Sequence, residues 1–155
     1  MKISVRFIIL MLFAGNVAFA QSEEASIKKT VSDYLEGGTN GDVNRFKSAF
    51  VNDAVQRSVA KTGGITGMTV ESLASKIKPG TVMERSTNLV SWSYAGDAAT
   101  AITETIYPTS KIIDLLNLLK VNGEWKIVSR VFSRIEKNEQ VSSSSGNSYS
   151  ASTTN

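Results

Sequence analysis

The 155-residue sequence contains no cysteine and no histidine, and these two absences exclude more function classes than any other feature. Without cysteine the chain forms no disulfide, and without both residues it has none of the usual zinc ligands. Catalysis by a Ser-His-Asp triad, a Cys-His dyad or a histidine base is excluded too. Metal binding would need carboxylates alone. Because the acidic residues are scattered, we expect no metal site and no cofactor.

The N-terminus has the layout of a secretory signal peptide over residues 1–20. Lys2 and Arg6 give a positive start, an apolar run follows, and Ala18-Phe19-Ala20 provides a small-x-small cleavage site. The uncharged stretch is shorter than the about 20 residues that cross a bilayer, and no later segment is long and apolar enough to span one. We therefore expect cleavage after Ala20, export to the periplasm or the medium, and no stable membrane anchor.

The charge balance argues against nucleic-acid binding. Cleavage would remove Lys2 and Arg6 from 17 basic residues and none of the 14 acidic ones, so the net charge falls from +3 to +1. No later Lys/Arg run exceeds two residues, so the chain lacks a basic patch. From Val141 onward the sequence is mostly Ser, Thr, Asn and Gly. We therefore expect one domain over residues 21–136 and a disordered tail over residues 137–155.

The first half of the domain has helical patterns. A helix is predicted over Glu24–Gly37, with Ser22 as its N-cap and Gly37-Gly38 as its end. Asp42 and Thr69 are predicted to cap two further helices, the second of which ends at Lys78-Pro79-Gly80. Between them we expect a strand over Asp53–Val59 and a turn at Gly63-Gly64.

In the second half the apolar period changes from 3.6 to 2. The alternation predicts four strands, over Ser86–Tyr94, Ala98–Tyr107, Lys111–Val121 and Glu124–Ile135. The last two are joined by Asn122-Gly123, the strongest short hairpin signal. Helices followed by an antiparallel meander indicate an α+β fold, with the helices packed on one face of a curved antiparallel sheet.

Alternation divides the last predicted strand into two faces. One face, with Trp125, Ile127, Ser129, Val131 and Ile135, has the composition of a core face. The other face is mixed and holds Lys126, Val128, Arg130, Phe132 and Arg134. This second face is either a dimer surface or a solvated sheet face with snorkelling arginines.

Several motifs in this order carry a family resemblance. They are Tyr34-Leu35-Glu36-Gly37, Gly41-Asp42, Gly96-Asp97-Ala98-Ala99, and the stretch from Asp114 to Val128, which reads DLLNLLKVNGEWKIV. Over residues 24–133 the chain resembles the nuclear-transport-factor-2-like superfamily, and within it the "putative lumazine-binding" group of small bacterial proteins. The resemblance implies an α+β cone with a deep pocket between helices and sheet.

Steroid isomerases of this fold use a carboxylate base and a tyrosine, which makes Tyr34 and Asp114 weak catalytic candidates here. The alternative is a buried tyrosine and a structural hydrogen bond. Dehydratases of the fold rely on histidine, so that activity is excluded. A pocket lined by Tyr34, Trp92, Tyr94, Tyr107 and Asp114 could hold a flat heterocycle such as a pterin. Arg85 and Arg130 could meet an anionic ligand, or be ordinary surface charges.

We expect an exported, non-catalytic homodimer whose pocket binds a small apolar or heterocyclic molecule. Two alternatives stay open. One is an isomerase or lyase that uses a pocket carboxylate and a tyrosine. The other is a protein-interaction module of the cell envelope, for which an outer sheet face would be apolar and the pocket filled.

Overall fold

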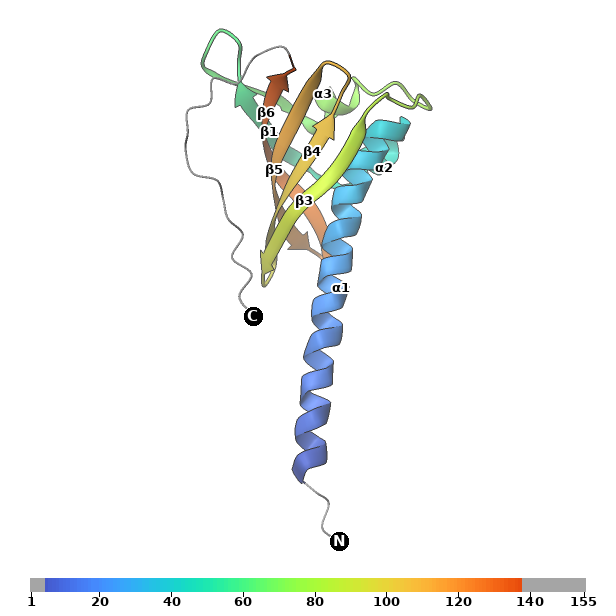
Figure 1. Cartoon of the computed structure of the whole chain (residues 1–155), viewed down its shortest axis with the longest axis vertical. Helices are drawn as coiled ribbons and strands as arrows, with labels where there is room; N and C mark the ends of the chain where they lie inside the picture. Colours follow the sequence, from blue (N-terminus) through green and yellow to red (C-terminus); the bar gives the residue numbers. More distant parts are fainter. Residues whose placement is uncertain (1–4, 138–155) are drawn as a thin grey trace.

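The computed structural model describes the backbone of residues 5–137 and the side chains from Glu23 onward. The helices are α1 (Val5–Asn40), α2 (Val43–Ser48) and α3 (Val70–Ala74) (Figure 1). The strands are β1 (Phe50–Val59), β2 (Ile65–Thr69), β3 (Ser86–Ala95), β4 (Ala98–Ile106), β5 (Ser110–Val121) and β6 (Glu124–Glu136). Apart from Lys137, the predicted tail lies outside the described residues, as do the first four residues of the predicted leader.

The six strands form one curved sheet in the order β2-β1-β6-β5-β4-β3. All neighbours are antiparallel except β1 and β6, which run parallel. Figure 1 shows a sheet that is narrow at the β3–β4 turn and wide at the end where α3 lies. Helix α1 runs along the sheet, and its N-terminal part extends past the narrow end. The α+β fold that the sequence predicts is confirmed, with one parallel strand pair added.

The first helix is longer than predicted at both ends. It starts at Val5, so Ser22 lies inside it and is not its N-cap. It also continues through Gly37-Gly38 to Asn40. The residue that ends it is Gly41, which has a φ of +70°. A Cβ there would lie 2.6 Å from the carbonyl oxygen of Lys78, so only glycine fits this left-handed position.

The short helices begin where the sequence places them. The side chain of Asp42 accepts a hydrogen bond from the backbone N–H of Arg45 at 2.9 Å. Thr69 Oγ1 accepts one from the backbone N–H of Ser72 at 3.1 Å. Helix α3 is shorter than expected, because it ends at Ala74 and not at the Pro79 turn. Strand β2 was not predicted. It is five residues long, contains a glycine, and has no buried side chain, so it carries no alternating signal.

The four long strands agree with the predicted ones to within two residues at each end. At the β5–β6 turn, Asn122 and Gly123 have φ values of +52° and +84°. Positive φ at both central residues defines the type I′ geometry that Asn-Gly favours. The hairpin pairs Val121 with Glu124 and Leu118 with Ile127, as a two-residue turn requires.

The predicted faces of β6 are correct only for its first half. A register shift between Asn117 and Leu118 of β5 shows that β6 has an extra residue at Val128. Such a bulge moves every later side chain to the opposite face. Trp125 and Ile127 are buried as expected, but beyond the bulge Arg130 points inward and Val131 is exposed. Phe132 follows Arg130 inward and does not lie on a dimer surface.

The core lies between α1 and the sheet. Its most completely buried side chains come from both layers, and they are Ile27, Val31, Leu116, Leu118 and Ile127. Each contributes about 1.5–3 kcal/mol of burial free energy. Toward the wide end the core consists of aromatic side chains. The rings of Tyr34, Phe46 and Phe50 lie 5.3–5.6 Å apart, centroid to centroid. This aromatic cluster forms the boundary between the core and the site.

Candidate functional site

A buried polar cluster is centred on Asp114, whose side chain is completely buried on the inner face of β5. Tyr34 of α1 donates its hydroxyl proton to Oδ2 at 2.8 Å, and Thr103 of β4 donates to the same oxygen at 3.0 Å. Arg130 of β6 donates from Nε to Oδ1 at 2.7 Å. Three elements of the sheet and the long helix therefore meet at one carboxylate.

Arg130 is the cation of this cluster and is only 5% exposed. Its Nη1 donates to Oε1 of Gln56 at 3.0 Å, and its guanidinium lies 4.0 Å from the ring centroid of Phe132. Burial disfavours the charge, but the interactions with Tyr34 and Asp114 outweigh it and raise the pKa of Arg130. Arg130 and Asp114 therefore form a buried ion pair.

Tyr34 keeps its proton to a higher pH than an exposed tyrosine does. Burial raises the pKa of its phenol far above the ordinary value, and the negative charge of Asp114 adds to the rise, although Arg130 opposes it. Since the proton of Tyr34 is donated to Asp114, the hydroxyl holds the carboxylate in place.

A cavity of about 280 Å³ opens above this cluster, at the wide end of the sheet. Its walls come from α1, α2, α3 and the loop that follows it, and from β2, β4, β5 and β6. Apolar and aromatic side chains make up most of the lining: Tyr34, Phe46, Met68, Leu73, Ile77, Met83, Tyr107, Ile112 and Phe132. The polar and basic part consists of Lys76, Arg85, Thr105, Arg130 and Arg134, with Gly38 beside them. An apolar cavity with few polar groups is typical of a small-molecule site.

Arg85 forms one wall of this cavity and is held by neutral acceptors. Its Nε donates to Thr39 Oγ1 at 2.9 Å, its Nη1 to the Tyr107 hydroxyl at 2.6 Å, and its Nη2 to the carbonyl of Leu35 at 3.1 Å. Gly38 makes room for it, because a Cβ at that position would lie 2.5 Å from Nη2 of Arg85.

The structure brings three of the five predicted pocket residues together. Tyr34 and Tyr107 line the cavity, and Asp114 lies directly behind Tyr34. Trp92 and Tyr94 lie elsewhere, toward the narrow end of β3, and are 36% and 38% exposed. The Lys28 ammonium lies 4.1 Å from the Trp92 ring, and Tyr94 packs edge-on against the core residue Trp125.

Sequence reasoning missed most of the cavity wall. The methionines Met68 and Met83 and the buried Gln56 carry no pattern that marks them as site residues. Phe132 and Arg130 were placed on the outer face, because alternation alone does not reveal a bulge. One signal was available: Asp114 at an inward position requires a cationic or donor partner.

Within residues 23–137, no group of three or more carboxylates is placed to hold a metal ion. In the same part of the chain, no helix is long and apolar enough to cross a membrane.

Solved structures with the same arrangement define the class of protein. A nuclear-transport-factor-2-like protein of unknown function from Shewanella baltica is 27% identical, covers 73% of this chain and 94% of its own, and superposes with a TM-score of 0.66. One from Silicibacter pomeroyi is 20% identical over 74% and 98% of the two chains, with the same TM-score. A ketosteroid isomerase-like protein from Erwinia carotovora is 15% identical over 72% and 95%, with a TM-score of 0.56. The fold is therefore nuclear-transport-factor-2-like.

Within that fold the particular group is also defined. The family described as "Putative lumazine-binding" matches residues 22–133, and the chain belongs to this family. The match covers the buried cluster and all of the cavity-lining residues except Arg134. No protein with a curated functional description matches the sequence.

Proposed function

We propose that the cavity binds a small apolar or heterocyclic molecule and performs no chemistry on it. The observation that carries this proposal is the state of Asp114. The carboxylate is completely buried, is not among the residues that line the cavity, and accepts hydrogen bonds from Tyr34, Thr103 and Arg130. The family's name supports a heterocyclic ligand.

A base must reach the proton that it abstracts, and an acid must have a proton to donate. Asp114 meets neither requirement, because donors occupy both of its oxygens and Tyr34 lies between it and the cavity. The Tyr34 proton is likewise engaged by Asp114. An isomerase would have to break this buried cluster in every turnover. Binding needs no such change, since the aromatic wall is already formed.

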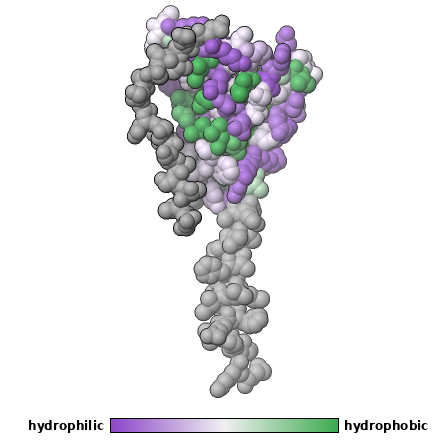
Figure 2. All heavy atoms as spheres, in the orientation of Figure 1, coloured by the Kyte–Doolittle hydropathy of each residue, from purple (hydrophilic) through white to green (hydrophobic). Residues whose placement is uncertain are grey.

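We further propose that the chain is exported after cleavage behind Ala20 and that it forms a homodimer. The leader sequence supports export. The dimer is supported by exposed apolar side chains on the outer sheet face, among them Leu115 and Val131. Figure 2 shows hydrophobic residues grouped over the sheet, with hydrophilic residues beside them.

The full-length gene would be expressed in its own host, and the protein would be purified gently from the envelope fraction and examined by native mass spectrometry. We expect a chain that begins at Gln21, a dimer, and a small molecule bound at up to one per chain. A chain that retains Met1 would contradict export. A cavity that is always empty would favour the protein-interaction alternative.

Binding would be tested directly by titrating lumazine into the purified protein and following its fluorescence. Phe132→Ala removes an aromatic ring from the cavity wall and should weaken lumazine binding at least tenfold. Trp92→Ala is the matched control, because Trp92 is aromatic but lies outside the cavity. If Trp92→Ala weakens binding and Phe132→Ala does not, the ligand site is at the narrow end and the proposal is wrong.

A further inference from the structure

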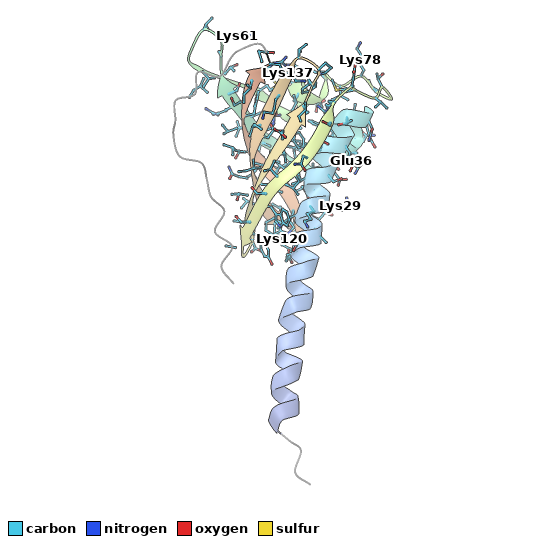
Figure 3. The ribbon with its side chains drawn as sticks, in the orientation of Figure 1. Lys29, Glu36, Lys61, Lys78, Lys120 and Lys137 are labelled. Carbon is cyan, nitrogen blue, oxygen red and sulfur yellow. The ribbon has the colours of Figure 1, made fainter. Side chains whose placement is uncertain are left out.

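The charged residues that line the cavity are all of one sign. They are Lys76, Arg85, Arg130 and Arg134, and no aspartate or glutamate is among the lining residues. Figure 3 places three further lysines at the same wide end of the molecule, namely Lys61, Lys78 and Lys137, whereas Lys120 lies at the narrow end. A ligand that enters the cavity therefore contacts cationic side chains and no anionic ones in the lining.

Two of the four cations are neutralised by the protein itself. Arg130 is paired with Asp114 in the buried cluster, and Arg134 donates to Glu136 at 2.6 Å. The other two have no carboxylate within ion-pair distance in the part of the chain that the structure describes. For Lys76 the contact found is with the sulfur of Met68 at 3.7 Å. Two positive charges at the cavity are thus left for a ligand to balance.

Arg85 is the better placed of these two. Its three hydrogen bonds to neutral acceptors fix the plane of the guanidinium and account for three of its five N–H groups. The absence of a Cβ on Gly38 keeps that position open. A planar, fixed guanidinium with donor capacity left binds a carboxylate or a similar anion well, because little side-chain entropy is lost on binding.

We propose that the ligand of this cavity is a small organic anion: its apolar or aromatic body lies against Phe46 and Phe132, and its anionic group binds Arg85, with Lys76 adding charge at the mouth. This inference rests on the proposed binding function and specifies the chemical class of the ligand. It also explains why Arg85 is half-buried without an acidic partner of its own.

The test uses two probes of equal shape, 2-naphthoate and the uncharged 2-naphthamide, titrated into the full-length protein by calorimetry. We expect 2-naphthoate to bind at least tenfold more tightly, which corresponds to about 1.4 kcal/mol. Arg85→Gln should abolish this preference, so that the two probes bind the variant with equal affinity. Lys61→Gln removes an equal charge from an exposed turn outside the cavity and should keep the preference.

A second variant moves the guanidinium without changing any charge. Gly38→Ala places a methyl group against Nη2 of Arg85, a flexible end that can be displaced without unfolding the chain. It should reduce the preference for 2-naphthoate, and a thermal melt would verify that both variants are folded. Equal binding of the two probes by the natural protein would overturn the anion inference and leave the binding function intact. If neither probe binds although lumazine does, the anion inference fails and the binding function stands; if lumazine does not bind either, both fail.

Discussion

At the scale of single residues, the buried pair of Asp114 and Arg130 determines how the site tolerates change. Both side chains are removed from water, and each compensates the charge of the other. Removing one partner of such a pair leaves an unpaired charge inside the protein, which costs more than the pair contributes. The cluster is therefore a constraint on stability as well as on function.

Asp114→Asn should lower the free energy of unfolding by about 3 kcal/mol at pH 7, because Arg130 keeps its charge and loses its counter-ion. Urea denaturation would measure the change. Asp53→Asn is the matched control, since Asp53 is exposed on β1, and it should stay within about 0.5 kcal/mol of the natural protein. The double variant Asp114→Asn/Arg130→Met should recover part of the loss. A single variant as stable as the natural protein would show that the cluster is solvated.

The phenol of Tyr34 makes the stability of the protein depend on pH in the alkaline range. Its pKa is raised in the folded state, mainly by burial, and is close to 10 in the unfolded chain. The folded state therefore keeps a proton that the unfolded state releases above pH 10. Stability that is complete below pH 10 is lost as the pH rises further, by about 1.4 kcal/mol for each pH unit.

Unfolding free energies measured at pH 8 and pH 11 would give this loss. The Tyr34→Phe variant should lose less stability between the two pH values, because it lacks the ionisable phenol. Tyr94→Phe removes an exposed tyrosine and should retain it. The same pH dependence in the natural protein and in Tyr34→Phe would show that the Tyr34 hydroxyl is accessible to water.

At the scale of elements, Glu23 connects α1 to the narrow end of the sheet through two hydrogen bonds. Its Oε2 accepts from Trp125 Nε1 at 2.8 Å, and its Oε1 accepts from Lys120 Nζ at 2.5 Å. These two donors lower the pKa of Glu23. If cleavage occurs behind Ala20, Glu23 becomes the third residue of the mature chain, and this contact is what anchors its first turn.

Glu23→Ala should raise hydrogen exchange in residues 24–30 at pH 7, as measured by mass spectrometry on peptides. Glu24→Ala is the control, because Glu24 pairs with the half-exposed Lys28 one turn later on the same helix. The difference between Glu23→Ala and the natural protein should fade as the pH falls through the lowered pKa of Glu23. Below that pH the Glu23 carboxyl of the natural protein is protonated and no longer holds Lys120 by its charge. Equal exchange in the two variants would show that core packing alone holds the helix start.

The ends of the elements show which features the sequence predicts and which it does not. Asn122-Gly123 predicts the β5–β6 turn because asparagine and glycine both tolerate positive φ, so the local sequence decides the outcome there. The end of α1 was misplaced because a long-range contact decides it. Gly37 and Gly38 are followed by helix-compatible residues, whereas Gly41 must lie against the 78–81 loop.

The same distinction explains the candidate site. The hairpin register alone places Val131 opposite Asp114, and the bulge at Val128 replaces it with Phe132 and brings Arg130 inward. A bulge has no periodic signature, so alternation assigned Arg130 and Phe132 to the wrong face. Tyr34 and Asp114 were both named as weak catalytic candidates through the family resemblance, but their direct hydrogen bond was not predicted.

At the scale of the whole molecule, the bulge also redefines the outer face of the sheet. Leu115 of β5 lies between Ile102 of β4 and Val131 of β6 in the strand register. Leu115 and Val131 are 49% and 47% exposed, and they lie on the face opposite the cavity. Apolar side chains from three neighbouring strands therefore lie side by side on this face, and an exposed apolar patch is the kind of surface through which proteins associate.

If this surface forms the homodimer, Leu115→Lys should convert the protein to a monomer, because the two copies of an isologous interface would each bury a lysine charge. Sedimentation equilibrium of the purified protein would measure the mass. Val59→Lys is the control, since Val59 is even more exposed but lies at the end of β1, beside the Gly63-Gly64 turn. A natural protein that sediments as a monomer would refute the dimer. A Leu115→Lys variant that remains dimeric would show that the interface lies on another face. Ligand binding should persist in the variant whether it is monomeric or dimeric, because the cavity opens on the opposite side of the sheet.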